Sequence, residues 1–487
     1  MSPQPNSQDN AGAATRAPLS TGRLRLVPLV VACPMFLQNL DGSVLGTALP
    51  AIAQSLNADV LHLNLAITSY LLSLVLFLPA SAWLADRFGA RRIFCAAVLI
   101  FTVASVLCGA ATSLGQLIVF RLLQGVGGAM MVPVGRLILL QTVPAEQMVL
   151  AMVWFTVPGG IGRLLGPLMG GAIVTVASWR WIFLVNIPFG VVSVLMALRV
   201  IDPDPPRGEG VAARPDALGL LLLAAALGGM LGALEMIGKD MLPWTGIAAL
   251  AVGGAAALWL YLRRSRAQSE PLIDFGILRY ATYRVAVAGG MPLRVAIGAA
   301  PFLLPLLFQL GLGMTPLDAG ILMLASAVGS LGSRGLVTSA VERFGYRQLL
   351  IGAALLTSGF QACYALFTPA TPHVLIVAVL LVSGACHSTV LVILATIGYG
   401  DIPRKRMGHA TALATMGQQL SVALGVAVAA SLLEAMHGLH GLGAAPLAIA
   451  DFRVPMLAMA AMPFLSVLAF VRLTRGGALH GAERPPA

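Results

Sequence analysis

Charged residues are scarce in this sequence. Asp, Glu, Lys and Arg together make up 10% of its 487 residues, and aromatic residues make up only 6%. Soluble proteins carry about 25% charged residues, so a soluble globular chain is excluded. Hydrophobic residues instead make up 58%, and the mean hydropathy is +0.89. This composition indicates a polytopic membrane protein.

Acidic residues are fewer than basic ones, 19 against 30, which leaves a net charge of +11. Such a charge can indicate nucleic-acid binding when the basic residues gather on one soluble domain. Here they fall in short loops between apolar runs. We therefore expect a lipid bilayer as the partner, and no nucleic acid.

Several chemical signatures are missing. Five cysteines lie within or beside apolar segments and form no CxxC pair, so neither a disulfide framework nor a metal site is expected. The sequence has no P-loop, nucleophile elbow or cluster of metal ligands. We expect no cofactor, no use of ATP and no enzymatic activity. The first apolar run is too long for a signal peptide, so we also expect no cleaved leader.

Long apolar runs dominate what is present. A membrane-spanning helix needs about 20 apolar residues, and on that rule the sequence predicts fourteen spans. They are expected at 26–52, 62–85, 92–111, 115–142, 148–177, 180–200, 216–237, 243–263, 282–310, 316–341, 346–367, 371–399, 407–436 and 453–474.

The basic residues predict the orientation of these spans. With both termini in the cytoplasm, 22 of the 30 Lys and Arg residues fall on the cytoplasmic side and five fall within spans. Three fall on the opposite side: Arg180, Lys239 and Arg453. This asymmetry follows the positive-inside rule and requires an even number of spans.

Two polar stretches, 201–216 and 263–279, bracket the seventh and eighth spans. We therefore expect an all-α membrane protein with two six-helix bundles and two inserted helices between them. The predicted parts are a cytoplasmic tail (1–24), a first bundle (25–200), linkers with the inserted helices (201–279), a second bundle (280–476) and a cytoplasmic tail (477–487).

An internal repeat supports this division. ADRFGARR (85–92) follows the second span, and VERFGYRQ (341–348) follows the tenth, which is the second span of the other bundle. Duplicated halves are typical of transporters, whose substrate site lies between the halves near the midplane of the bilayer.

Five N-terminal segments carry recognisable motifs: LDGSVLGTALP (40–50), WLADRFGARR (83–92), FRLLQGVGGAMM (120–131), GRLLGPLMGG (162–171) and WRWIFLVNIPFG (179–190). These segments resemble motifs of the major facilitator superfamily and of its 14-span drug:proton antiporters. The sequence departs from the superfamily pattern at two positions. Ser81 stands where the motif usually opens with Gly, and Glu342 stands in the second copy where the motif has Asp. The resemblance implies a monomer in the bacterial inner membrane that exchanges protons for exported small molecules by alternating access.

Asp41 is the first candidate for proton coupling. An Asp at the centre of a bilayer costs roughly 2.5–3.5 kcal/mol, which favours a function over chance. A carboxylate in a cavity of low dielectric can load and release protons as its surroundings change. The alternative is a packing role, with hydrogen bonds to the backbone, Gln38 or Asn39.

Arg121 is the second candidate. An intramembrane Arg keeps its charge and must find a carboxylate, carbonyl groups or water. The resemblance associates this Arg with proton transfer, where it could hold a nearby acid in its ionised form until substrate arrives. The alternative is a brace between spans.

The segment 158–171 is rich in glycine, which lets helix backbones approach closely. Pro residues in the same segment kink the helix. We expect a tightly packed span that slides against the other half and seals a leak, rather than ordinary helix packing. The resemblance assigns the antiporter motif to Gly162, Gly166, Pro167, Gly170 and Gly171.

Charges at the span ends of the two repeat copies can pair between helices and stabilise one access state. The alternative is a contribution to topology alone. These predicted gating residues are Asp86, Arg87, Arg91, Glu342, Arg343 and Arg347.

Further polar residues within spans are candidates for the substrate cavity: Gln38, Arg136, Glu235, Arg294, Gln309 and His387. Glu235 lies near the outer end of its span, where its carboxylate could instead reach water. His387 could titrate at physiological pH, or it could be a packing histidine.

Two substrate classes remain open at this stage. A multidrug exporter agrees with the resemblance and with the apolar, Met-containing interior. However, Asp41 is the one clearly mid-membrane acid against five intramembrane arginines, and Arg binds carboxylates and phosphates bidentately. The arginines without an obvious acidic partner nearby in the sequence are Arg136, Arg163, Arg294 and Arg334. An exporter of an organic anion, such as a polycarboxylate or a metal chelate, is therefore the alternative.

Overall fold

The computed structural model describes residues 21–204, 216–237, 239, 242–268, 271–403, 406–440 and 447–473. Most of the predicted tails and the centre of the first linker lie outside these residues. In the described part of the chain every regular element is a helix.

The N-terminal half contains eight α-helices: α1 (Thr21–Leu56), α2 (Asn64–Phe77), α3 (Ala80–Phe88), α4 (Ala90–Ala110), α5 (Leu114–Thr142), α6 (Met148–Val176), α7 (Trp181–Leu184) and α8 (Asn186–Val200). The inserted pair is α9 (Ala217–Met236) and α10 (Trp244–Ala267). The C-terminal half contains α11 (Ala281–Arg284), α12 (Met291–Leu306), α13 (Pro316–Tyr364), α14 (His373–Gly398), α15 (Met407–Leu439) and α16 (Ile449–Phe470).

Short single-turn elements complete the list. They are the 3₁₀ helices η1 (Val60–Leu63), η2 (Ala145–Gln147) and η3 (Phe275–Arg279), and the π-helices η4 (Val285–Gly289) and η5 (Leu307–Gly311).

Thirteen continuous helical stretches of the described chain are long and apolar enough to cross a membrane. One of them, α13, is 49 residues long and is interrupted at Gly345, whose φ of 75° is not helical. This position separates the tenth predicted span from the eleventh. The structure therefore agrees with the prediction of fourteen spans.

Several boundaries differ from the prediction. The helix α1 is longer at both ends than the predicted span 26–52. The second span is divided into α2 and α3 at Leu78 and Pro79. Proline lacks the backbone N–H that would continue the helix, which explains the break.

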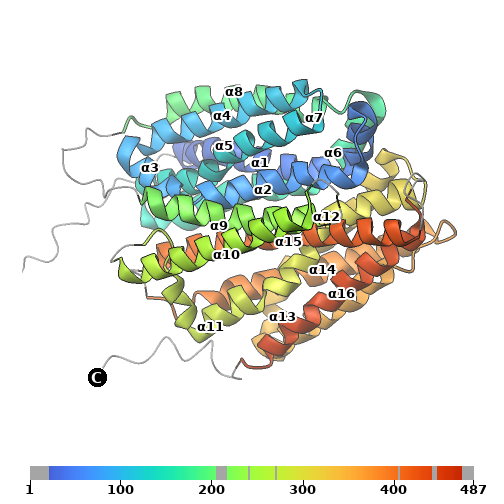
Figure 1. The fold of residues 1–487 in the computed structure, drawn as a ribbon. Helices are drawn as coiled ribbons and strands as arrows, with labels where there is room; N and C mark the ends of the chain where they lie inside the picture. Colours follow the sequence, from blue (N-terminus) through green and yellow to red (C-terminus); the bar gives the residue numbers. More distant parts are fainter. Residues whose placement is uncertain are drawn as a thin grey trace, which may run out of the picture.

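The helices run roughly parallel to one another and form two groups, α1–α8 and α11–α16 (Figure 1). The inserted helix α9 packs against α10, and it also contacts α2 of the first group and α15 of the second. The predicted fold class, two six-helix bundles with an inserted helix pair, is confirmed.

The two halves meet closely at the end of the molecule where α1 finishes, which we call the Leu56 end. The backbone of α1 at Gly46 lies against the Pro301 carbonyl of α12, so a Cβ at Gly46 would overlap that oxygen. Gln309 Nε2 donates to the Thr47 carbonyl oxygen at 2.9 Å. His62 Nε2 lies 3.6 Å from Glu434 Oε1 of α15.

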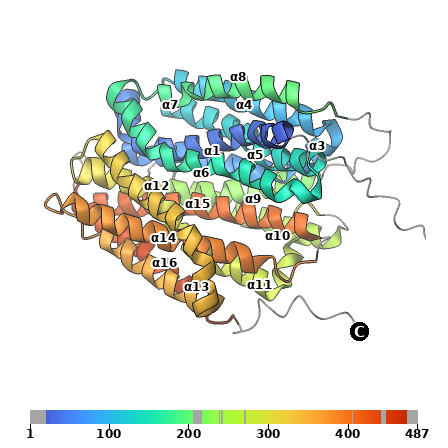
Figure 2. The same cartoon turned by 180° about the vertical axis from the view of Figure 1, so that it is seen from behind.

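The helices α6 and α13 make a second contact between the halves, at the front of Figure 2. Gly171 faces the backbone of Pro316, and Gly320 faces the backbone of Pro167. Because glycine has no Cβ, the two backbones can touch at these points. Further along the same helices, Arg163 and Arg334 are exposed.

Candidate functional site

Asp41 of α1 and Arg121 of α5 form a buried ion pair. Arg121 Nη1 lies 2.5 Å from Asp41 Oδ2, and the two residues are 1% and 4% exposed. Two charges can be buried at this depth because each neutralises the other and both are hydrogen-bonded. The structure thus brings together the two residues that the sequence predicted for proton coupling.

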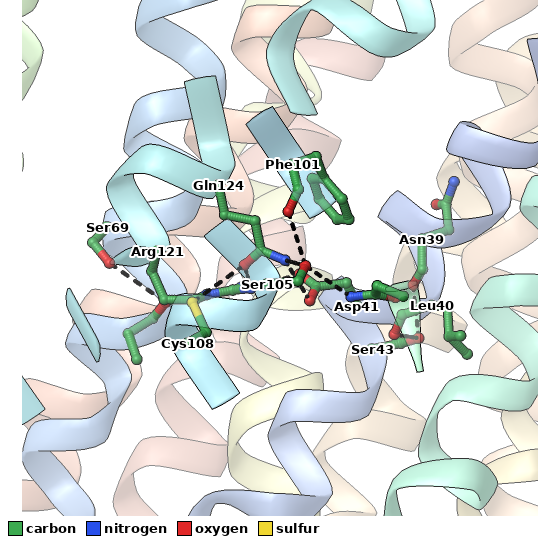
Figure 3. Close-up of polar contacts among 12 residues, drawn as sticks. Asn39, Leu40, Asp41, Ser43, Ser69, Phe101, Ser105, Cys108, Arg121 and Gln124 are labelled. Carbon is green, nitrogen blue, oxygen red and sulfur yellow. Dashed lines mark hydrogen bonds and ion pairs between the residues drawn. The ribbon is translucent and has the colours of Figure 1, made fainter. Parts of the chain in front are cut away.

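Gln124 joins the pair from the next turn of α5 (Figure 3). Its Nε2 donates to Asp41 Oδ1 at 3.0 Å, and its Oε1 accepts from Arg121 Nη1 at 2.7 Å. The same Nε2 donates to Ser105 Oγ of α4 at 2.8 Å. Gln124 was not among the predicted site residues, although its place three residues after Arg121 puts it on the same helix face.

Helix α2 supplies two more contacts to Arg121. Nε of Arg121 donates to the Ala66 carbonyl oxygen at 3.0 Å. The guanidinium carbon lies 4.2 Å from the centre of the Tyr70 ring, a distance at which the ring attracts the cation. Arg121 is therefore fixed by α1, α2 and α5 together.

The alternative hypothesis for Asp41, local bonds to Gln38 or Asn39, is wrong for Asn39. The Asn39 amide donates instead to the Met35 carbonyl oxygen at 2.8 Å, and its Oδ1 accepts from Arg163 Nη2 at 2.8 Å. Asp41 is held by residues of α5, about 80 positions away in the sequence.

A small cavity lies beside this network, between the two halves. Its walls come from α1, α2 and α5 on one side and from α12 and α15 on the other. Arg121 is the one charged residue among those that line it, and Tyr70 adds a phenol group. The remaining lining residues are glycines and apolar side chains, such as Leu45, Ile67 and Phe302.

Other predicted cavity residues lie outside this lining, and their role in substrate binding stays a prediction. Gln309 bonds across the halves to Thr47, as described above. Arg294 Nη1 donates to the Ala286 carbonyl oxygen at 2.8 Å, at the π-helix that precedes α12. His387 Nε2 lies 3.2 Å from Ser383 Oγ on α14. Gln38 on α1 and the exposed Arg136 on α5 also lie outside.

Glu235 does not reach water, in contrast to one reading of the sequence. It is 3% exposed, and its carboxylate lies 3.2 Å from Nζ of Lys239. Lys239, which the sequence placed in an outer loop, is itself 4% exposed. A third residue, Asn64 of α2, bonds to both charges. Linear sequence could not show this burial because Asn64 is 171 positions from Glu235.

The glycines of the antiporter motif face two different helices. Gly162, Gly166 and Gly170 recur every fourth residue and pack against α1, where their nearest atoms belong to Phe36, Ser43 and Thr47. Pro167 and Gly171 instead meet α13 of the other half, as described above. The expected contact with the other half is therefore made by one edge of the motif, while the glycine row packs within its own half.

The first of the two predicted gating loops pairs with partners that the sequence did not suggest. Asp204, after α8, accepts from the backbone N–H groups of Arg91 and Arg92 at 3.1 and 3.3 Å. The Arg91 guanidinium donates to the Leu198 carbonyl oxygen. These contacts tie the start of α4 to the end of α8. Other predicted gating side chains are exposed: Asp86, Arg87, Glu342 and Arg343.

Comparison with known proteins agrees with this architecture. Residues 31–426 match the family described as the Major Facilitator Superfamily. Proteins of Salmonella typhimurium and Klebsiella pneumoniae, provisionally named multidrug resistance protein MdtD, are 38% identical over 450 residues. The match covers 91% of this chain and 94% and 93% of the two relatives.

Solved structures share the fold at low sequence identity. A bacterial homologue of the human lysosomal transporter Spinster, in an inward-facing occupied conformation, has a TM-score of 0.64 and 16% identity, over 93% of this chain and 96% of that one. A D-xylose-proton symporter has a TM-score of 0.61 and 15% identity, over 92% and 97%. Together with the sequence match, these likenesses show that this multi-pass membrane protein belongs to the Major Facilitator Superfamily.

Proposed function

We propose that this chain is a proton-coupled antiporter that exports small molecules, of the multidrug type, across the bacterial inner membrane. Both termini would lie in the cytoplasm, in agreement with the distribution of basic residues. The observation that supports coupling most directly is the Asp41–Arg121 pair, because it places a buried carboxylate beside a cavity between the two halves.

The pair suggests how a proton and a substrate compete. Arg121 Nη1 donates to Asp41 Oδ2, and the two opposite charges offset each other. A substrate that enters the cavity and draws Arg121 away would leave that carboxylate unpaired in a dry site, where it is unfavourable. If Asp41 takes up a proton, it becomes neutral and this free-energy cost of an unpaired charge disappears. Substrate and proton occupancy would thereby be linked through the position of one guanidinium.

The lining of the cavity favours hydrophobic substrates over polyanions. Its charge comes from Arg121, which Asp41 already neutralises, and the rest of its surface is mainly apolar. Arg294 is bonded to backbone carbonyls, and Arg163 is bonded to Asn39. The arginine excess in the sequence therefore does not translate into an anionic-substrate pocket beside the pair.

The contacts between the halves lie at a definite side of the proposed membrane orientation. If both termini are cytoplasmic, the Leu56 end faces outward, because α1 then runs from the cytoplasm to the outside. The two halves touch there at Gly46, Thr47 and Gly171. In that orientation the structure is closed toward the outside.

Purified protein in liposomes tests the proposal. With a pH gradient imposed and a pH-sensitive dye inside, a lipophilic cation and a polycarboxylate are added separately to wild type and to Asp41→Asn. We expect the lipophilic cation to cause proton flux in wild type and not in Asp41→Asn. Flux that is unchanged in the variant would remove Asp41 from the coupling mechanism. Flux with the polycarboxylate alone would reverse the assignment of substrate class.

A further inference from the structure

A buried ionic cluster that the transport mechanism above does not use lies where the end of α9 meets the start of α2. Asn64 Nδ2 donates to Glu235 Oε2 at 2.5 Å, and Lys239 Nζ donates to Asn64 Oδ1 at 2.7 Å. Lys239 also lies 3.2 Å from the same carboxylate oxygen of Glu235. We call these three residues the Asn64 triad. All of them are less than 5% exposed.

The triad contacts α2 at Asn64, the first residue of that helix. Asn64 opens this helix, and its carbonyl oxygen also accepts from Thr68 Oγ1 at 3.1 Å. The next turns of the same helix carry both of its contacts to the coupling pair, the Ala66 carbonyl and the Tyr70 ring. A shift of the start of α2 would therefore move the groups that hold Arg121.

The same turn of α9 also touches the C-terminal half. Ser431 Oγ of α15 donates to the Leu234 carbonyl oxygen at 3.4 Å. Helix α9 thus joins α2 by charged hydrogen bonds and α15 by one neutral hydrogen bond, at the Leu56 end. Charged hydrogen bonds are the stronger kind, so α9 is tied more firmly to the half that contains Arg121.

A buried ion pair contributes little net stability, because desolvation offsets much of the attraction between its charges. What such a pair supplies well is a fixed geometry, since neither partner can leave without exposing the other. The Glu235–Lys239 pair bonds to the start of α2, the helix that contacts Arg121. A fixed geometry of the pair therefore fixes the position of that helix.

We infer that the Asn64 triad positions α2 against Arg121, so that the inserted helix pair is a working part of proton coupling. The inference rests on the proposed antiport function. Glu235, Lys239 and Asn64 are positioning residues, because they reach Arg121 only through α2.

Two double variants separate positioning from folding. E235Q/K239M removes both charges and leaves no lone buried charge. E235K/K239E exchanges the two charges at the end of α9, and the Asn64 amide can still serve both groups by turning over, because it carries a donor and an acceptor. Ile237→Ala, at an exposed position between the two charged residues, is the matched control.

The readout is the pH profile of substrate-dependent proton flux. If the triad only stabilised the fold, its loss would leave this profile unchanged. We expect E235Q/K239M to lower the maximal flux about tenfold and to displace its pH profile, because Arg121 is held less well. E235K/K239E should recover the profile of wild type, and Ile237→Ala should match wild type throughout.

Hydrogen exchange in α2 (Asn64–Phe77) is measured on the same samples. Faster exchange in E235Q/K239M with an unchanged pH profile would reduce the triad to a structural brace and overturn the inference. Absence of flux in wild type would instead count against the proposed function, so the two failures are distinguishable.

Discussion

Arg121 Nη1 lies 2.5 Å from Asp41 Oδ2, in a network that also contains Gln124 and Ser105. Four hydrogen bonds among residues of α1, α2 and α5 hold the carboxylate and the guanidinium, and Arg121 lines the cavity. Arg121 thus connects the cavity to a carboxylate that is itself buried.

Gln124→Leu tests this network. Leucine has a similar size but leaves Asp41 Oδ1 and Ser105 without their amide donor, and an unsatisfied buried polar group costs about 1–3 kcal/mol. We expect substrate-dependent proton flux to fall about tenfold while the folded yield changes little. Gln141→Leu, at an exposed position on the same helix, is the control. Equal flux in the two variants would mean that Gln124 is dispensable to the pair.

Gly166→Ala tests the packing of α6 on α1. A Cβ at this position would overlap the Ser43 side chain, and overpacking typically costs about 1–3 kcal/mol. We expect a lower midpoint of thermal unfolding in detergent. This midpoint is measured by size-exclusion chromatography with fluorescence detection.

The control on the same helix is Gly160→Ala, because a Cβ there meets nothing within 4 Å. Alanine stabilises a helix relative to glycine by up to about 1 kcal/mol, so this variant should unfold at the same or a higher temperature than wild type. A common midpoint for the two variants would contradict close packing at Gly166.

Gly46→Ala tests the contact between the halves at the Leu56 end. The new Cβ would overlap the Pro301 carbonyl oxygen, which belongs to the backbone and cannot rotate away. We expect the halves to separate there in a larger share of molecules. Spin labels at Gln54 and His373, near the ends of helices from opposite halves, should report a longer mean distance.

Gly42→Ala is the control on the same helix, since no atom lies within 4 Å of its Cβ position. Its distance distribution should match that of wild type. An unchanged distribution in Gly46→Ala would show that the contact adapts without separating the halves.

Asp204→Ala tests the link between α8 and α4. The Asp204 carboxylate accepts from the N–H groups of Arg91 and Arg92 at the start of α4, as an N-cap does. Loss of a cap typically costs about 1 kcal/mol, so we expect a small decrease in the thermal midpoint. Asp204→Asn keeps an oxygen acceptor and should retain most of the stability. A midpoint for Asp204→Ala equal to that of wild type would remove Asp204 as a cap.

The sequence by itself determined the class, the span count and the duplicated plan of this protein. Each of these follows from local properties: the length of apolar runs, the polar stretches between them and a motif that occurs twice. It also predicted Asp41 and Arg121 singly, because an intramembrane charge is expensive wherever it points.

Only the tertiary structure decided which charges meet. Asp41 is hydrogen-bonded to Arg121 and Gln124, some 80 residues away in the sequence, and Glu235 is hydrogen-bonded to Asn64, 171 residues away. Nothing in a linear pattern fixes such partners, because they depend on which helix faces come together. For the same reason the sequence overestimated the number of arginines free to bind an anion. It could count the intramembrane charges, but only packing decided that Arg294 would bond to backbone carbonyls and that Arg121 would be neutralised beside the cavity.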